Sequence, residues 1–74
     1  MWKLTDANGV VLAKRLEGQT AAEYEATRRW PGCEFDGNLD NGATQIYVYL
    51  GDEHVGFLDP PQSLLDELRE DRDR

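Results

Sequence analysis

Alternation of apolar and polar residues at the start of the chain predicts a β-hairpin. Trp2 and Leu4 fall on one face of an expected strand over residues 2–5, because side chains two apart in a strand point the same way. A second strand is expected over residues 10–16. The intervening Asp-Ala-Asn-Gly of residues 6–9 contains the Asn-Gly pair that supplies the positive φ angles of a tight turn.

The segment after this hairpin has the pattern of an amphipathic helix. Thr20 and Glu23 fit a capping box, in which the hydroxyl and the carboxylate satisfy amide groups of the first turn. A stripe that recurs every four residues is expected to face the core: Ala22, Ala26 and Trp30. Pro31 and Gly32 are expected to end the helix.

Three further strands are expected, over residues 33–36, 44–50 and 54–58. The middle one has the strongest strand pattern in the chain, because it is rich in β-branched and aromatic residues. One face of that strand is apolar: Ile46, Val48 and Leu50. The other face is polar and aromatic: Gln45, Tyr47 and Tyr49. In the third of these strands, Val55 and Phe57 are expected to join the core face.

A second helix is expected near the C-terminus, with Asp59 as its cap and Pro60 at its first position. Its buried stripe is formed by three leucines: Leu64, Leu65 and Leu68. Residues 1–70 are expected to form a single domain, followed by a charged, frayed tail over residues 71–74. The order ββαβββα predicts an α+β fold, a small antiparallel sheet with two helices packed on one face.

With both helices on one face, the other face of the sheet is left to water or to a partner. Tyr47, Tyr49, Gln45 and Lys3 are expected there, and Gly56 on the neighbouring strand leaves room for a tyrosine ring to lie across it. The tyrosines then serve either as a shield for the sheet or as contacts for another protein.

The charge of the chain is unevenly distributed and totals −7. Residues 1–33 contain four acids and five bases, whereas residues 34–74 contain eleven acids and three bases. No Lys or Arg occurs between Glu34 and Glu67. Such a field disfavours nucleic acid and anionic membranes as direct partners and favours a basic protein surface, although solubility alone also accounts for it.

The size and the cysteine content narrow the class of protein. A chain of 74 residues forms one domain, and it has neither a disulfide nor a zinc site to reinforce its core, because Cys33 is its only cysteine and His54 its only histidine. A lone thiol suits a reducing compartment, and no apolar run approaches the roughly 20 residues of a membrane span. We therefore expect a cytoplasmic protein.

Candidates for catalysis and metal binding are few. Asp36, Asn38 and Asp40 resemble the start of a calcium loop, but the required glycine and final glutamate are missing, so an ordinary acidic turn is favoured. A nucleophilic dyad of Cys33 and His54 requires the fold to bring the two side chains together. We expect no catalytic residue, no cofactor and no metal, and thus a protein that is not an enzyme.

The favoured interpretation is a non-catalytic domain that binds a basic protein surface. Carboxylates along a strand, a turn and the next strand imitate the charge pattern of a phosphate backbone, while aromatic side chains provide a desolvated anchor. The candidate contacts are six acids and two tyrosines: Glu34, Asp36, Asp40, Asp52, Glu53, Asp59, Tyr47 and Tyr49.

In size, acidity and compact α+β outline, the whole chain resembles the small acidic inhibitors that bacteriophages and mobile elements deploy against host defences, the anti-CRISPR proteins among them. That resemblance implies a stoichiometric inhibitor that blocks a nuclease or surveillance complex at its nucleic-acid-binding surface. No motif is shared, so no residue role transfers. The alternative is an acidic interaction module, or a subunit of a larger assembly, that binds through its tyrosine-bearing sheet face. Salt distinguishes the two, because charge mimicry weakens steeply with ionic strength.

Overall fold

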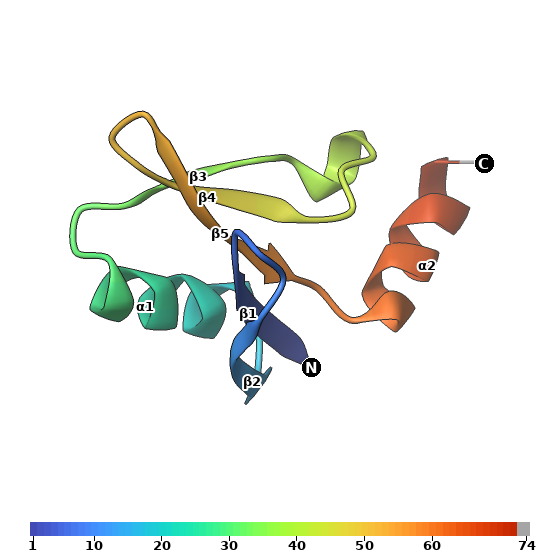
Figure 1. The fold of residues 1–74 in the computed structure, drawn as a ribbon. Helices are drawn as coiled ribbons and strands as arrows, with labels where there is room; N and C mark the ends of the chain where they lie inside the picture. The colour runs from blue at the N-terminus through green and yellow to red at the C-terminus, as the bar shows by residue number, and fades with distance from the viewer. Residues whose placement is uncertain (73–74) are drawn as a thin grey trace.

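A five-stranded antiparallel sheet and two α-helices form the protein in the computed structural model, which describes residues 1–72 (Figure 1). The elements are β1 Trp2–Asp6, β2 Val11–Leu16, α1 Gln19–Arg29, β3 Glu34–Asp36, the 3-10 helix η1 Leu39–Asn41, β4 Ile46–Leu50, β5 Glu53–Asp59 and α2 Gln62–Arg72. The strand order is β2-β1-β5-β4-β3, with every neighbouring pair antiparallel. The predicted α+β fold and element order are confirmed.

The first hairpin forms where the sequence predicts it. The carboxylate of Asp6 accepts hydrogen bonds from the backbone N–H groups of Asn8 and Val10, both at 2.9 Å. Gly9 supplies the left-handed conformation of the turn, with φ at 86°. A short acidic side chain and one glycine therefore fix this turn.

The core lies between one face of the sheet and the two helices. Its buried apolar side chains come from the sheet, from α1 and from η1: Trp2, Leu4, Ala22, Ala26, Leu39, Ile46, Val48 and Leu58. Helix α1 packs against β1, β2 and β5, whereas α2 lies at the other end of the sheet beside η1 (Figure 1). The predicted stripe of α2 is confirmed, because Leu64, Leu65 and Leu68 pack against the core.

A β-bulge changes the alternation along β5. The register between β4 and β5 shifts by one residue, which leaves Val55 without a partner on β4. An extra residue in one strand reverses which face the following side chains take. Leu58 is therefore fully buried, while Phe57 contacts the His54 ring on the opposite face. The prediction that Phe57 joins the core is wrong; Val55 does pack against the core.

Gly56 accommodates a tryptophan rather than a tyrosine. A Cβ atom at Gly56 would lie 2.8 Å from Cη2 of Trp30 and 2.5 Å from the carbonyl oxygen of Thr5. The expectation that a tyrosine lies across Gly56 is wrong, because the bulge turns this residue toward the core. Trp30, the residue just after α1, packs over β5 there.

Helix α1 begins two residues earlier than the predicted capping box places it, at Gln19. Gly18 occupies the N-cap position and no side chain caps the helix, so the expected capping box of Thr20 and Glu23 does not form. The predicted end is confirmed, because Gly32 takes a left-handed conformation with φ at 84° just after the helix. A glycine at the N-cap loses only a few tenths of a kcal/mol relative to a capping side chain.

Helix α2 begins at Gln62 and extends to Arg72. Asp59 is the last residue of β5 and not the cap of this helix, since its carboxylate binds side chains of the sheet. The helix includes residues 71 and 72, which were expected to belong to a frayed tail. Residues 73–74 of that tail lie outside the described residues.

Candidate protein-binding face

The face of the sheet opposite the core, here called the outer face, is free of both helices. Residues directly opposite each other on paired strands share a face, so the register identifies its members. They are Lys3, Thr5, Val11, Glu34, Asp36, Gln45, Tyr47, Tyr49, His54, Phe57 and Asp59. The expected placement of the two tyrosines beside Gln45 and Lys3 agrees with this register.

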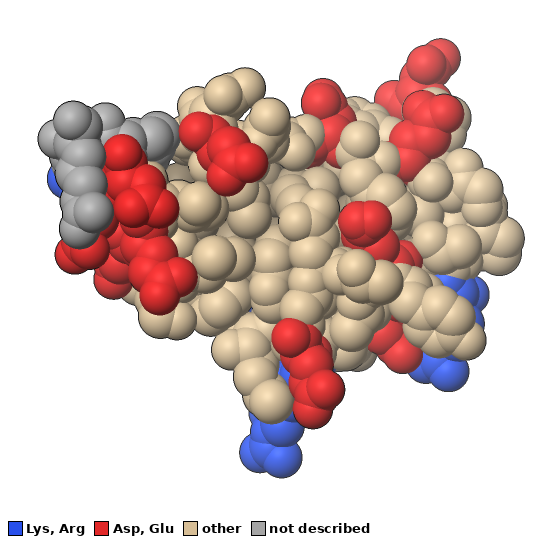
Figure 2. Space-filling model, turned by 180° about the vertical axis from the view of Figure 1, so that it is seen from behind, with Lys and Arg blue, Asp and Glu red and all other residues tan. Residues whose placement is uncertain are grey.

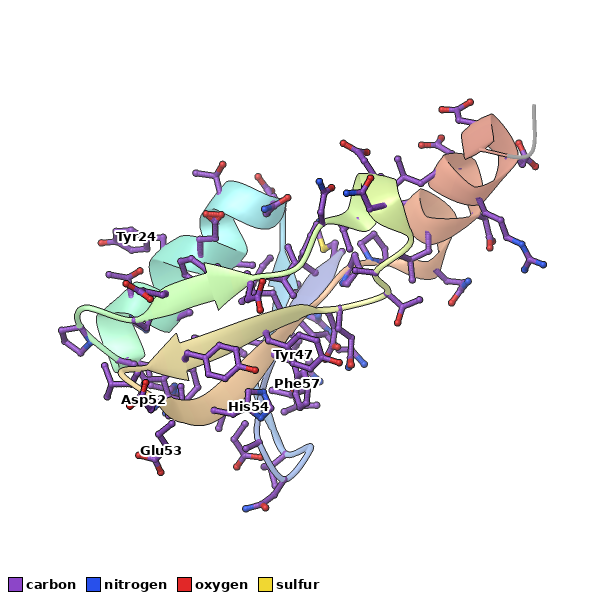
Figure 3. All side chains as sticks on the ribbon, turned by 90° about the horizontal axis from the view of Figure 1, so that it is seen from above. Tyr24, Tyr47, Asp52, Glu53, His54 and Phe57 are labelled. Atoms are coloured by element: carbon purple, nitrogen blue, oxygen red, sulfur yellow. The ribbon has the colours of Figure 1, made fainter. Side chains whose placement is uncertain are left out.

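Four rings contact one another on the outer face and form what we call the aromatic cluster. Its members are Tyr47, Tyr49, His54 and Phe57. The ring centroids are 4.5 Å apart for His54 and Phe57 and 5.3 Å apart for Tyr47 and Phe57. All four pairs are tilted or edge-to-face, the arrangements that aromatic quadrupoles favour. Figure 3 shows Tyr47, His54 and Phe57 together on the side of β4 and β5 away from α1.

The histidine of this cluster is held by the backbone. Its Nε2 lies 2.8 Å from the carbonyl oxygen of Gly56, and a carbonyl only accepts, so Nε2 is the donor. The bulge brings the His54 and Phe57 rings together, because it places the two residues on one face although they are three residues apart. The His54 ring is thereby fixed between the two tyrosines and Phe57.

The tyrosines keep surface available for a partner. Tyr47 is 41% exposed and Tyr49 is half-buried. Within residues 1–72, neither tyrosine hydroxyl is hydrogen bonded to another side chain or to the backbone. A ring with a free hydroxyl offers both apolar contact and a polar handle.

Two of the six predicted acids lie beside the aromatic cluster, and two more lie at the end of the hairpin that carries it. Glu34 is opposite Tyr49 and Asp36 is opposite Tyr47 on the edge strand β3. The other two occupy the turn and the strand start at the end of the β4–β5 hairpin: Asp52 and Glu53. Glu53 is opposite Leu50 and therefore takes the side of the sheet that faces the core. All four side chains are exposed.

These carboxylates have no cationic partner within the described part of the chain. There the one ion pair joins Arg28 and Glu25 on α1, at 3.0 Å. Figure 2 shows acidic side chains spread over the visible face and along its margins, whereas Lys and Arg side chains are few and lie at the margins. The negative charge beside the aromatic cluster is therefore not neutralised internally.

Asp59, the fifth predicted acid, is engaged inside the protein. Its Oδ1 accepts a hydrogen bond from Gln45 Nε2 at 2.7 Å, and its Oδ2 accepts one from Thr5 Oγ1 at 3.1 Å. The structure thus gives this carboxylate the role of linking β5 to β1 and to Gln45, the residue just before β4.

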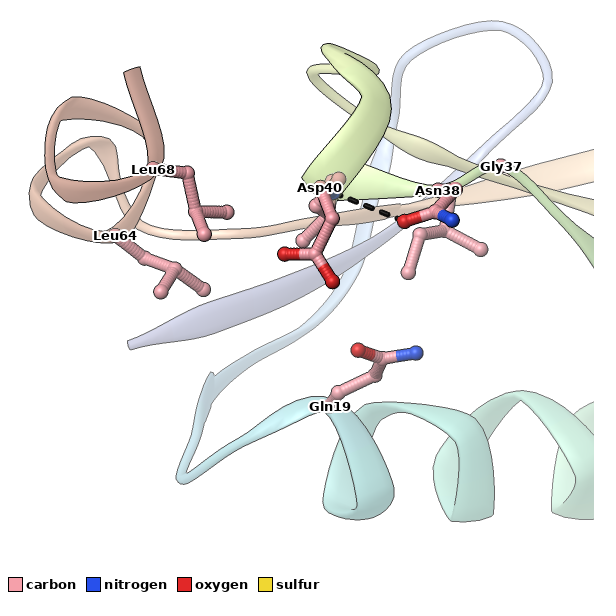
Figure 4. A pocket seen from close by; sticks show the side chains of 8 residues that line it. Gln19, Gly37, Asn38, Asp40, Leu64 and Leu68 are labelled. Carbon is pink, nitrogen blue, oxygen red and sulfur yellow. Dashed lines mark hydrogen bonds between the residues drawn. The ribbon is translucent and has the colours of Figure 1, made fainter. Parts of the chain in front are cut away.

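Asp40, the sixth, lies away from the aromatic cluster. It borders a cavity of about 230 Å³ between α1, η1 and α2, together with Gln19, Leu64 and Leu68 (Figure 4). The Asn38 side chain caps η1 by accepting from the Asp40 N–H at 2.9 Å. Across residues 1–72, no group of three His, Cys, Asp or Glu side chains is arranged to hold a metal ion.

The structure does not bring Cys33 and His54 together. Cys33 is half-buried and packs against the core, with Sγ 3.9 Å from the Thr27 hydroxyl. His54 lies in the aromatic cluster on the outer face. The proposed dyad therefore does not form in this fold.

Two members of the aromatic cluster, His54 and Phe57, were missed by pattern alone. Strict alternation places them on different faces, and the bulge places them on one. An isolated glycine inside a strand is a known signal of a bulge, and Gly56 provides it.

No protein-family model, no curated protein and no solved structure matches this chain. None of the helices over residues 1–72 is both long and apolar enough to cross a bilayer. A function for the chain is therefore inferred from the chemistry of the outer face.

Proposed function

We propose that the chain is a non-catalytic protein-binding domain that docks its outer face on a basic protein surface. One observation supports this most directly. The uncovered face of the sheet joins four rings, connected to one another through His54 and Tyr47, to exposed carboxylates that have no cationic partner among the described residues. Rings that merely shield a sheet need no such acidic border.

The two parts of the face have different roles in binding. Aromatic side chains at the centre of an interface supply most of the affinity once water is excluded around them. Exposed carboxylates at the border raise the association rate and suppress acidic partners. The interaction is therefore expected to weaken as salt increases, because these charges are screened over about 8–10 Å at physiological ionic strength.

The sharper form of this proposal is an inhibitor. Exposed carboxylates from β3 and the β4–β5 turn border one face, as phosphates border a nucleic-acid strand. A domain of this kind occupies the nucleic-acid-binding surface of a host defence complex, as an anti-CRISPR-like protein does. The alternative is an interaction module or assembly subunit that uses the same face without competing with nucleic acid.

Affinity capture from nuclease-treated lysate, at low and high salt, tests the proposal with three baits. The first is the wild type. The second carries Glu34→Lys and Asp36→Lys on the outer face. The third carries Glu67→Lys and Glu70→Lys, two exposed acids of α2, and so has the same net charge as the second. A partner held by the wild type and the α2 variant, but lost with the face variant or with salt, supports the outer face.

Experiments with the captured partner then distinguish the inhibitor from the assembly subunit. Displacement of labelled nucleic acid from that partner by the domain supports the inhibitor, whereas a ternary complex supports the assembly subunit. A partner that the face variant retains and the α2 variant loses would contradict the proposal.

A further inference from the structure

We infer that the outer face binds two arginine side chains of one extended segment, spaced as Arg-x-Arg. This inference rests on the proposed function and specifies the chemistry of its partner. The observation behind it is a repeat. Glu34 faces Tyr49 across the β3–β4 ladder, and Asp36 faces Tyr47 two residues further along.

Each repeat places a carboxylate beside an aromatic ring. Directly opposite residues have Cβ atoms about 5 Å apart, so one group can touch both side chains. The acids are exposed, and no cation of the described residues neutralises them. Each pair thus presents the apolar surface of a tyrosine ring with a carboxylate beside it.

Arginine matches this pair better than lysine does. A guanidinium is planar and can stack on a tyrosine ring while its edge donates two parallel hydrogen bonds to a carboxylate. The ammonium group of lysine is a compact, strongly hydrated charge without a flat surface. Cation–π contacts in proteins accordingly involve arginine more often.

The spacing of the two pairs selects an extended ligand. Residues two apart on a strand are separated by about 6.5–7 Å, and both side chains point the same way. An extended segment that runs along β3 and β4 presents alternate side chains at the same interval. Arg-x-Arg therefore fits both pairs, whereas Arg-x-x-Arg turns its second arginine away.

The two tyrosine rings are held in place by other side chains of the protein before any ligand binds. His54 contacts both tyrosine rings and is fixed by its bond to the Gly56 carbonyl, and Phe57 supports Tyr47 from the adjacent strand. Side chains held in this way lose little conformational entropy on binding. The bulge in β5 thus contributes to recognition through the two rings that it brings together beside the tyrosines.

Titration of the ¹⁵N-labelled domain with capped glycine–threonine peptides tests this inference. The peptides contain Arg-x-Arg, Lys-x-Lys or Arg-x-x-Arg and have the same charge. We expect Arg-x-Arg to bind about tenfold more tightly than the other two, with amide shifts concentrated on β3 and β4. Glu34→Gln with Asp36→Asn should abolish the preference, and Glu67→Gln with Glu70→Gln on α2 should preserve it.

The tyrosines are tested by two variants of different severity. Tyr47→Phe with Tyr49→Phe keeps the rings and should keep the preference for arginine, whereas Tyr47→Leu with Tyr49→Leu should lose it. Equal affinity for arginine and lysine peptides, with shifts still on β3 and β4, would overturn the inference and leave the proposed function standing. Absence of binding by every peptide, or shifts elsewhere, would overturn it as well. The proposed function is tested separately, by the affinity capture from lysate.

Discussion

The two faces of the one sheet use similar residue types in opposite ways. On the core face, which α1 covers at β1, β2 and β5, Leu4, Val48 and Leu58 are fully buried. On the outer face, rings are packed just as closely to one another, yet Tyr47 remains 41% exposed and carboxylates stand beside it. Apolar residues alone therefore do not distinguish the core face from the outer face. The two faces differ in whether a helix covers them and in whether charged side chains surround their apolar residues.

Adjacent residues of β5 provide the most direct test of this difference. Leu58→Ala removes a fully buried side chain from the core and is expected to lower the free energy of unfolding by about 3 kcal/mol. Phe57→Ala removes a larger side chain from the outer face but should cost only about 1 kcal/mol, the scale of its ring contacts. Urea denaturation measures both. A larger loss for Phe57 than for Leu58 would place Phe57 in the core, as strict alternation without the bulge predicts.

Gly56→Ala tests the contact between α1 and the centre of the sheet. The added methyl group would meet Trp30 and the Thr5 carbonyl, and the strain is expected to cost about 2 kcal/mol in thermal or urea unfolding. Gly18→Ala is the control, because nothing lies within 4 Å of a Cβ atom there and its φ of 174° suits any residue. It should cost less than about 1 kcal/mol, the difference between glycine and alanine at the N-cap of α1. Equal, small effects at both glycines would contradict the close packing of Trp30.

The sequence predicted the fold well because β1, β3 and β4 alternate regularly between the two faces of the sheet. The stripe of Ala22 and Ala26 is buried, and the expected apolar face of β4 includes buried Ile46 and Val48. The prediction failed in β5, where one extra residue at Val55 interrupts the alternation of side chains. Every later residue of β5 therefore takes the face opposite to the predicted one. Helix starts also failed, because caps depend on which groups the tertiary structure makes available.

The candidate site could be predicted only in part for the same reason. The alternation of β4 places Tyr47 and Tyr49 on the outer face, and the placement of Glu34 and Asp36 opposite them follows from the order of β3 beside β4. His54 could not be included, because its role depends on the bulge. Nor does a count of acids reveal that Asp59 is engaged internally while Asp52 is exposed.

These last two acids provide the smallest and most discriminating test. Asp59→Ala removes the acceptor of two side-chain hydrogen bonds and leaves the hydroxyl of Thr5, a residue only 6% exposed, without its partner. We expect a loss of about 1 kcal/mol in unfolding free energy, because an unsatisfied buried hydroxyl keeps its desolvation cost. Asp52→Ala at the exposed turn changes the net charge equally and should stay within about 0.5 kcal/mol of the wild type. If both substitutions had the same small effect, Asp59 would have to be counted with the free acids of the outer face, and its carboxylate would become available to a basic partner.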